Sequence, residues 1–285
     1  MGKDWAKGLT KATDPRIARN AAAHVGLRYN SHLPPALDKR RWSPAGPVDT
    51  TWTPMLAYAV GLIATDGNLS PNGKTTNVVS GDVDLLESFK RCIPRAGRIG
   101  RHGPNCWHVT VSSVDFYRWL QSIGLTPAKS LTLGGIDVPD AVFTDLVRGL
   151  MDGDGSLQSY VHHPGGNVRR YPTYRYERLI VRFHSASPTH LRWLRDRLRR
   201  LLSIDGAILK VKLKRDRKNH MYELRYGKHA SLTLLPLMYA DPDAPRLDRK
   251  WKIWDAYLRR ARINSLQKRR SDETEDIADS RSAGP

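Results

Sequence analysis

An internal repeat is the feature that most constrains how this chain can fold. Two apolar stretches with helical periodicity each end in an Asp-Gly pair, the first at Asp66 and the second at Asp154. Thr53 and Pro54 supply a start signal for the first predicted helix, and Asp140 opens the second. These matched helices predict two similar structural units in tandem.

The segments that follow each helix also share one pattern of strands, a helix, further strands and a last helix. In the first unit the predicted strands cover residues 77–80, 98–102 and 107–112, and the predicted helices cover 82–92 and 114–123. In the second unit the predicted strands cover residues 156–163, 177–185, 207–215 and 221–226, and the predicted helices cover 188–202 and 229–238. The sequence therefore predicts an α+β fold of two tandem αββαββα repeats, closed by an amphipathic helix over 248–262.

The repeats divide the chain into four predicted segments. A basic, proline-punctuated extension covers residues 1–50, and the two repeats cover 51–135 and 136–263. Residues 264–285 form a polar tail of mixed charge without periodicity, which predicts disorder.

The charge of the chain indicates a polyanionic partner. The sequence holds 47 Lys and Arg against 28 Asp and Glu, for a net charge of +19, and residues 169–218 contain 16 of the basic residues with four acidic ones. Solvated faces usually mix both signs, so a run of one sign on alternating strand positions favours contact with nucleic-acid phosphates.

Several protein classes are excluded by other features. Cys92 and Cys106 are too few for a disulfide framework or a four-cysteine zinc site. No apolar run reaches the roughly 18 residues of a membrane span, and the first residues lack the apolar core of a signal peptide. We therefore expect a soluble protein that is not secreted, in the cytoplasm near the nucleoid or in an organellar matrix.

Asp66 and Asp154 are the candidate functional residues. A carboxylate in the last turn of a helix meets the negative end of the helix dipole at a cost of up to about 1 kcal/mol, so we expect a cation to offset it. Gly61 and Gly149 allow the two helix backbones to approach closely, which would bring both aspartates to one end of the interface. Two clustered carboxylates suit Mg²⁺, and such ions near a phosphodiester support nuclease chemistry.

Two simpler interpretations of these aspartates fit the sequence less well. A single Asp-Gly pair is more simply a helix-to-turn signal, but two copies in matched repeats reverse that preference. A calcium-binding loop starting at Asp152 fails, because Leu157 and His163 stand where Gly and Glu are needed.

The two motifs resemble those of the single-chain LAGLIDADG homing endonucleases. The residues are Val60-Gly61-Leu62-Ile63-Ala64-Thr65-Asp66-Gly67 and Arg148-Gly149-Leu150-Met151-Asp152-Gly153-Asp154-Gly155. The first motif has Ala64 and Thr65 where the family pattern has Asp-Ala, but it keeps the last aspartate. The resemblance covers roughly residues 50–262 and includes the order of helices and strands.

This resemblance implies a pseudo-two-fold monomer that lays two antiparallel sheets along the major groove of double-stranded DNA and cuts across the minor groove. Mg²⁺ would be held by Asp66 and Asp154 with the backbone carbonyls of Thr65 and Gly153. Mn²⁺ is expected to substitute, and Ca²⁺ to support binding without cleavage. The resemblance also implies one lysine in each half beside the attacking water, for which we select Lys129 and Lys250, with Lys74 and Lys228 as alternatives.

Strand residues that project into the groove are expected to read bases, since Arg pairs with guanine and Asn or Gln with adenine. Candidates in the first half are Asn68, Lys74, Asn77, Arg98, Arg101 and His108. Candidates in the second half are Gln158, Tyr160, Arg175, Arg178, Arg182, Lys210, Lys212, Lys214, Arg217 and Arg225.

The leading hypothesis is thus a monomeric, metal-dependent DNA endonuclease that needs no protein partner. An RNA maturase or a non-cleaving DNA-binding regulator on the same scaffold is the alternative, because either could retain both aspartates.

Overall fold

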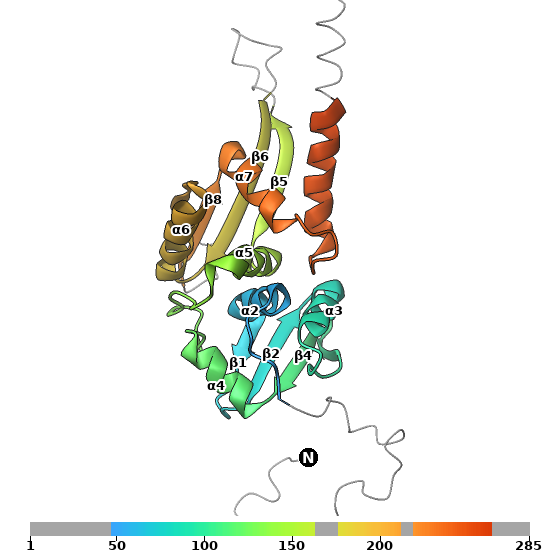
Figure 1. Ribbon diagram of the computed structural model, residues 1–285, viewed down its shortest axis with the longest axis vertical. Coiled ribbons are helices and arrows are strands. Elements are labelled where there is room, and N and C mark those ends of the chain that lie inside the picture. The colour runs from blue at the N-terminus through green and yellow to red at the C-terminus, as the bar shows by residue number, and fades with distance from the viewer. Residues whose placement is uncertain (1–46, 163–175, 212–218, 264–285) are drawn as a thin grey trace, which may run out of the picture. The chain divides into compact units, whose positions relative to one another are not determined.

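The computed structural model describes residues 47–162, 176–211 and 219–263 (Figure 1). The predicted tail at 264–285, and residues 1–46 of the predicted extension, lie outside these ranges. The predicted segment boundaries therefore stay predictions. None of the helices within these ranges is long and apolar enough to cross a membrane.

The first repeat contains three helices and four strands. They are α2 (Pro54–Asp66), β1 (Gly67–Leu69), β2 (Thr75–Ser80), α3 (Val83–Cys92), β3 (Gly100–Gly103), β4 (Cys106–Ser112) and α4 (Val114–Ser122). Strand β1 is absent from the sequence prediction, because three residues directly after a helix are too few to show an alternating pattern.

The second repeat has the same order of elements. A 3₁₀ turn η1 (Asp140–Val142) leads into α5 (Phe143–Asp152), followed by β5 (Ser156–His162), β6 (Tyr176–Ser185), α6 (Pro188–Leu202), β7 (Ala207–Val211), β8 (Met221–Tyr226) and α7 (Lys228–Met238). A further helix covers residues 248–263. The predicted α+β fold of two αββαββα repeats is confirmed.

Side-chain caps fix where several of these helices begin. The hydroxyl of Thr53 accepts the backbone N–H of Leu56 at the start of α2, which also has Pro54 in its first turn. Ser113 caps α4 and Ser187 caps α6 in the same way. Each cap satisfies a backbone donor that has no partner within its helix.

Each repeat forms one antiparallel four-stranded sheet, with strand order β1-β2-β4-β3 in the first and β5-β6-β8-β7 in the second. The registers match between repeats: Asn77 is paired with Thr110, and Arg182 with Arg225. Residues at equivalent places in the two halves can therefore be compared directly.

Alternation along the strands separates a helix-covered face from an open face in each sheet. In β6, Leu179, Val181 and Phe183 are buried against the helices, so Arg182 and His184 lie on the open face. Lys210 is paired with Tyr222 rather than with Glu223, which places it on the helix-covered side at the sheet edge. Lys210 therefore does not share the open face with Arg182 and Arg225, and its predicted role in DNA binding stays a prediction.

Helices α2 and α5 lie side by side where the two repeats meet, with β1 and β2 beyond α2 and β5 and β6 beyond α5 (Figure 1). Nine consecutive residues of α2, from Leu56 to Ala64, are buried. This explains why the segment is apolar on all sides rather than amphipathic.

Candidate functional site

Two glycines set how closely α2 and α5 approach. A Cβ atom added to Gly61 would lie 2.8 Å from both the Cα of Gly149 and the backbone nitrogen of Leu150. A Cβ added to Gly149 would lie 3.0 Å from the Cα of Gly61. The backbones of the two helices thus touch at this point, and no side chain fits between them.

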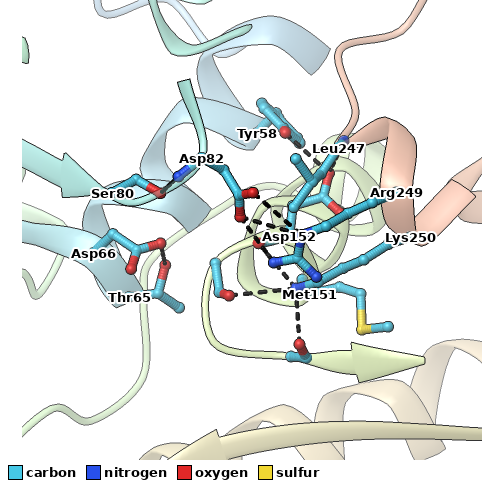
Figure 2. A network of polar contacts seen from close by, with 12 residues as sticks. Tyr58, Thr65, Asp66, Ser80, Asp82, Met151, Asp152, Leu247, Arg249 and Lys250 are labelled. Atoms are coloured by element: carbon cyan, nitrogen blue, oxygen red, sulfur yellow. Dashed lines mark hydrogen bonds and ion pairs between the residues drawn. The ribbon is translucent and has the colours of Figure 1, made fainter. Parts of the chain in front are cut away.

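This contact brings the C-terminal ends of the two helices together. Asp66 is the last residue of α2, whereas Asp154 lies two residues beyond the end of α5. Between them, a Cβ added to Gly153 would be 2.7 Å from Oδ2 of Asp66 and would overlap the hydroxyl of Thr65. The Thr65 hydroxyl also lies 3.4 Å from Oδ2 of Asp66 (Figure 2).

The electrostatics of the two aspartates reflect their proximity. Burial, followed by repulsion from the Asp154 carboxylate, raises the pKa of Asp66 to about 6. Burial also raises the pKa of Asp154, opposed by the positive charges of His184, Lys250 and Lys129. Two partly desolvated carboxylates of like charge are stabilised by any cation that binds between them.

Lys129 and Lys250 occupy equivalent positions beside this pair. Both are buried, with 5% and 3% of their surface exposed. Lys129 donates to the carbonyl of Gly67, and Lys250 donates to the carbonyl of Gly155 at 2.7 Å. Each lysine therefore binds the carbonyl that directly follows the aspartate of its own repeat.

The two lysines differ in their other contacts. The ammonium of Lys250 also donates to the carbonyls of Met151, Asp152 (2.9 Å) and Gly153 (3.3 Å), which close the end of α5 (Figure 2). The ammonium of Lys129 has one carbonyl partner, that of Gly67. Burial lowers the pKa of Lys129 to about 8, opposed by the carboxylates of Asp154 and Asp66. Both carboxylates interact with Lys250 as well. Burial likewise lowers the pKa of Lys250 to about 8.

The alternative lysines have other surroundings. Lys74 is exposed in the turn before β2. Lys228 begins α7 and forms an ion pair with Glu177 at 3.3 Å, on the helix-covered side of the second sheet. A catalytic role for any of the four lysines remains a prediction.

Asp152 is a residue of the site that sequence reasoning missed. Its Oδ2 accepts the hydroxyl of Tyr58 at 2.9 Å and the backbone N–H of Leu247 at 2.8 Å (Figure 2). It thus joins α5 both to α2 and to the start of the helix at 248–263, and burial raises its pKa to about 6. The available signal was the unequal motif, which has Asp152 where the first has Ala64.

A second contact between the repeats lies near Lys250. Arg249 binds the carboxylate of Asp82, just before α3, with its Nη2 at 2.8 Å and its Nε at 3.1 Å from Oδ2 (Figure 2). The helix at 248–263 therefore contacts both repeats through neighbouring residues.

The open face of the first sheet begins at Asp66. Side chains from all four strands line an open pocket with it: Asn68, Asn77, Val79, His102 and His108. The amide of Asn77 is already engaged, because it donates to the hydroxyl of Ser70 at 3.1 Å and accepts from Thr110 at 2.7 Å.

The open face of the second sheet carries more charge. Gln158, Tyr160, Arg178, Arg182 and Arg225 occupy it in the registered strands. Sequence reasoning did not single out Glu223, whose carboxylate lies between Arg182, Arg225 and His184. His184 Nδ1 is also 3.0 Å from the backbone carbonyl oxygen of Asp154, so this cluster adjoins the aspartate pair.

Arg101 is paired with Trp107 and so lies on the helix-covered side of the first sheet. Arg98 precedes β3 rather than lying in it, and Arg101 donates to the carbonyls of Gly103 and Pro104 in its own hairpin. Four predicted DNA-binding residues lie outside the described residues: Arg175, Lys212, Lys214 and Arg217.

The oxygen atoms at the helix ends fit a divalent ion. Asp66 and Asp154 offer two partly buried carboxylates, and that of Asp154 raises the pKa of Asp66. Carboxylate oxygens are donors that Mg²⁺ accepts when water and phosphate complete its shell. In the described part of the chain, no group of three or more His, Cys, Asp or Glu side chains could hold a metal. The arrangement therefore suits an oxygen-bound ion shared with a substrate rather than an all-protein zinc site.

Comparison with known proteins agrees with this architecture. No model of a known protein family matches the chain, and no curated protein matches it. Among solved structures, the neighbours are LAGLIDADG homing endonucleases and the LAGLIDADG domain of WhiA, all at low sequence identity. The chain has the homing-endonuclease fold.

The likeness in fold is shown by the meganuclease I-SmaMI bound to uncleaveable DNA with a TTGT central four. It matches with a TM-score of 0.50 at 14% identity, over 77% of this chain and 92% of that chain. The I-SmaMI LAGLIDADG homing endonuclease bound to cleaved DNA gives 0.47 at 13%, over 76% and 91%. Full-length DUF199/WhiA from Thermatoga maritima gives 0.45 at 12%, over 82% and 70%.

Proposed function

We propose that this protein is a site-specific, metal-dependent endonuclease that cuts both strands of DNA. The observation that carries the proposal is the meeting of Asp66 and Asp154 at the ends of two helices in contact, so close that one carboxylate raises the pKa of the other. Folding alone gains nothing from this repulsion.

The surroundings of the aspartate pair support DNA as the substrate. An open sheet face adjoins each aspartate, and the second face carries three arginines. The meganuclease of the same fold was solved bound to DNA. Both motifs lie on one chain, so we propose that a monomer spans the two halves of a long target and cuts across the minor groove.

In this proposal each residue of the site has a separate role. Asp66 and Asp154, with the carbonyls of Thr65 and Gly153, hold Mg²⁺, which would stabilise charge on the scissile phosphate when bound. Lys129 adds positive charge beside both carboxylates and is the lysine we propose to polarise the attacking water. Lys250 holds the end of α5, which fixes the position of Asp154.

One observation favours a second candidate, a DNA-binding regulator that does not cut. The ammonium of Lys250 is bound to four backbone carbonyls, including that of Gly153, a proposed metal ligand. A scaffold stabilised in this way holds its shape without a metal ion.

Selection of bound duplexes from a random library in Ca²⁺, followed by transfer of the selected duplex to Mg²⁺, tests the proposal. We expect one preferred duplex and a double-strand break at one place in Mg²⁺ or Mn²⁺. Tight, sequence-specific binding without a break in either metal would establish the regulator instead. Binding to RNA in preference to every duplex would favour a maturase.

A further inference from the structure

The open face of the second sheet holds one acidic side chain among its described strand positions, Glu223, and it is nearly buried. Its side chain is 10% exposed. Its Oε1 lies 2.6 Å from Nε of Arg225 and 3.4 Å from Nε of Arg182, and its Oε2 lies 3.4 Å from Nε2 of His184. Phosphate affinity does not explain a carboxylate bound by two arginines on a face that would bind DNA.

The strand register explains part of this arrangement. Arg182 and Arg225 are directly opposite each other in β6 and β8, where two like charges repel. Glu223 offsets that repulsion by accepting a hydrogen bond from Arg225 and forming an ion pair with Arg182. The two arginines are nevertheless unequal, because the Arg182 side chain is 13% exposed and that of Arg225 is 44% exposed.

The exposed arginine is held in one orientation. Its Nε–H is bound to Glu223, so the terminal nitrogens are the part of the guanidinium left for an external acceptor. Two parallel N–H donors on a fixed, planar group match the O6 and N7 acceptors of guanine in the major groove. A freely rotating arginine would instead serve any phosphate.

The first half of the protein has no arginine positioned by a glutamate at the equivalent place. The positions equivalent to Arg182, Glu223 and Arg225 are Asn77, His108 and Thr110, by the matched registers. There the hydroxyl of Thr110 donates to Asn77 at 2.7 Å, and no arginine is present. The two halves therefore differ in what they can read at the same place.

The cluster also lies close to the proposed centre of cleavage. Arg182 is opposite Ser156, two residues after Asp154, and His184 reaches the Asp154 carbonyl. We infer that Arg225, positioned by Glu223, selects a guanine in the half-site bound by the second repeat, next to the cleaved step. This inference rests on the proposed function in so far as the ligand is duplex DNA.

The test measures affinities of the full-length protein, in Ca²⁺, for the selected duplex and for duplexes with each base pair replaced in turn. For the wild type we expect one G·C pair near the centre whose replacement weakens binding roughly 10- to 100-fold. Arg225→Gln should abolish that preference at that position alone, and Glu223→Gln should reduce it there. Arg192→Gln, which removes an exposed charge on α6, should leave the profile unchanged.

Each result is a ratio of two affinities of one protein, so partial unfolding of a variant does not alter it. A loss of affinity that is equal at all positions in Arg225→Gln would overturn the inference in favour of a phosphate contact. An unchanged profile in Arg225→Gln would also overturn it. Failure to cut in Mg²⁺ with the guanine preference intact would instead remove only the nuclease function.

Discussion

Replacing Gly61 by alanine tests the contact that assembles the site. The new Cβ would lie 2.8 Å from the Cα of Gly149 and from the backbone nitrogen of Leu150, and nearer still to the carbonyl oxygen of Leu146. Carbon atoms pack best at about 3.5–4.0 Å, so the helices must separate by roughly 0.7 Å or more. Because all three obstacles are backbone atoms, no side-chain rotation relieves the overlap.

The cost follows from this geometry. Overpacking a well-filled interior costs about 1–3 kcal/mol, and a backbone obstacle places this substitution near or above 3 kcal/mol. Helix propensity acts in the opposite direction, since alanine in a helix is favoured over glycine by about 1 kcal/mol. Gly61→Ala should therefore lower the free energy of unfolding, although helix propensity alone predicts that it would raise it.

Urea unfolding followed by circular dichroism measures this difference. The matched control is Gly134→Ala, where an added Cβ meets nothing within 4 Å, and we expect its free energy of unfolding to stay within about 1 kcal/mol of the wild type. A Gly61→Ala protein as stable as the Gly134→Ala protein would refute the close contact of α2 and α5.

Two further predictions concern buried basic groups. Lys250→Met leaves four carbonyls without their donor and should lower the free energy of unfolding by about 3 kcal/mol or more. Lys129→Met leaves one carbonyl without its donor and should lower it by about 1–3 kcal/mol. Equal losses in urea unfolding would contradict the anchoring role of Lys250. Burial lowers the pKa of His190 to about 4, although its Nδ1–H donates to the carbonyl of Gly134 at 2.8 Å. Its stabilising contribution is complete above pH 6.5, where the unfolded state is also neutral, and is lost as the pH falls from 6.5 to about 4, by about 3 kcal/mol in total. His190→Gln should flatten that part of the stability profile, and an unchanged pH dependence would show that another group is responsible.

The sequence pattern predicts much of the fold because it records which positions are buried. Leu179, Val181 and Phe183 alternate with polar residues, and this alone identifies the two faces of β6. The repeated helix followed by Asp-Gly likewise predicts two related units, since each repeat of the pattern corresponds to one structural unit.

The pattern fails where a residue's role depends on its cross-strand neighbour. Ile208 and Lys210 share one face of β7, but which face this is follows from pairing with β8, which periodicity does not contain. No sequence pattern marks Glu223, and its three basic neighbours come together only in the sheet. The partner of Asp152 at Leu247 is 95 residues away, so no local signal identifies it.

The most direct test of the central claim is cleavage of the selected duplex in Mg²⁺ by the wild type, Asp66→Asn and Asp154→Asn, with binding measured in Ca²⁺. Asp84→Asn, an exposed position on α3, is the matched control. We predict that the wild type and the control break both strands, and that either site variant loses double-strand cleavage by about 100-fold or more while still binding. Cleavage at the wild-type rate by Asp66→Asn or Asp154→Asn would contradict the account.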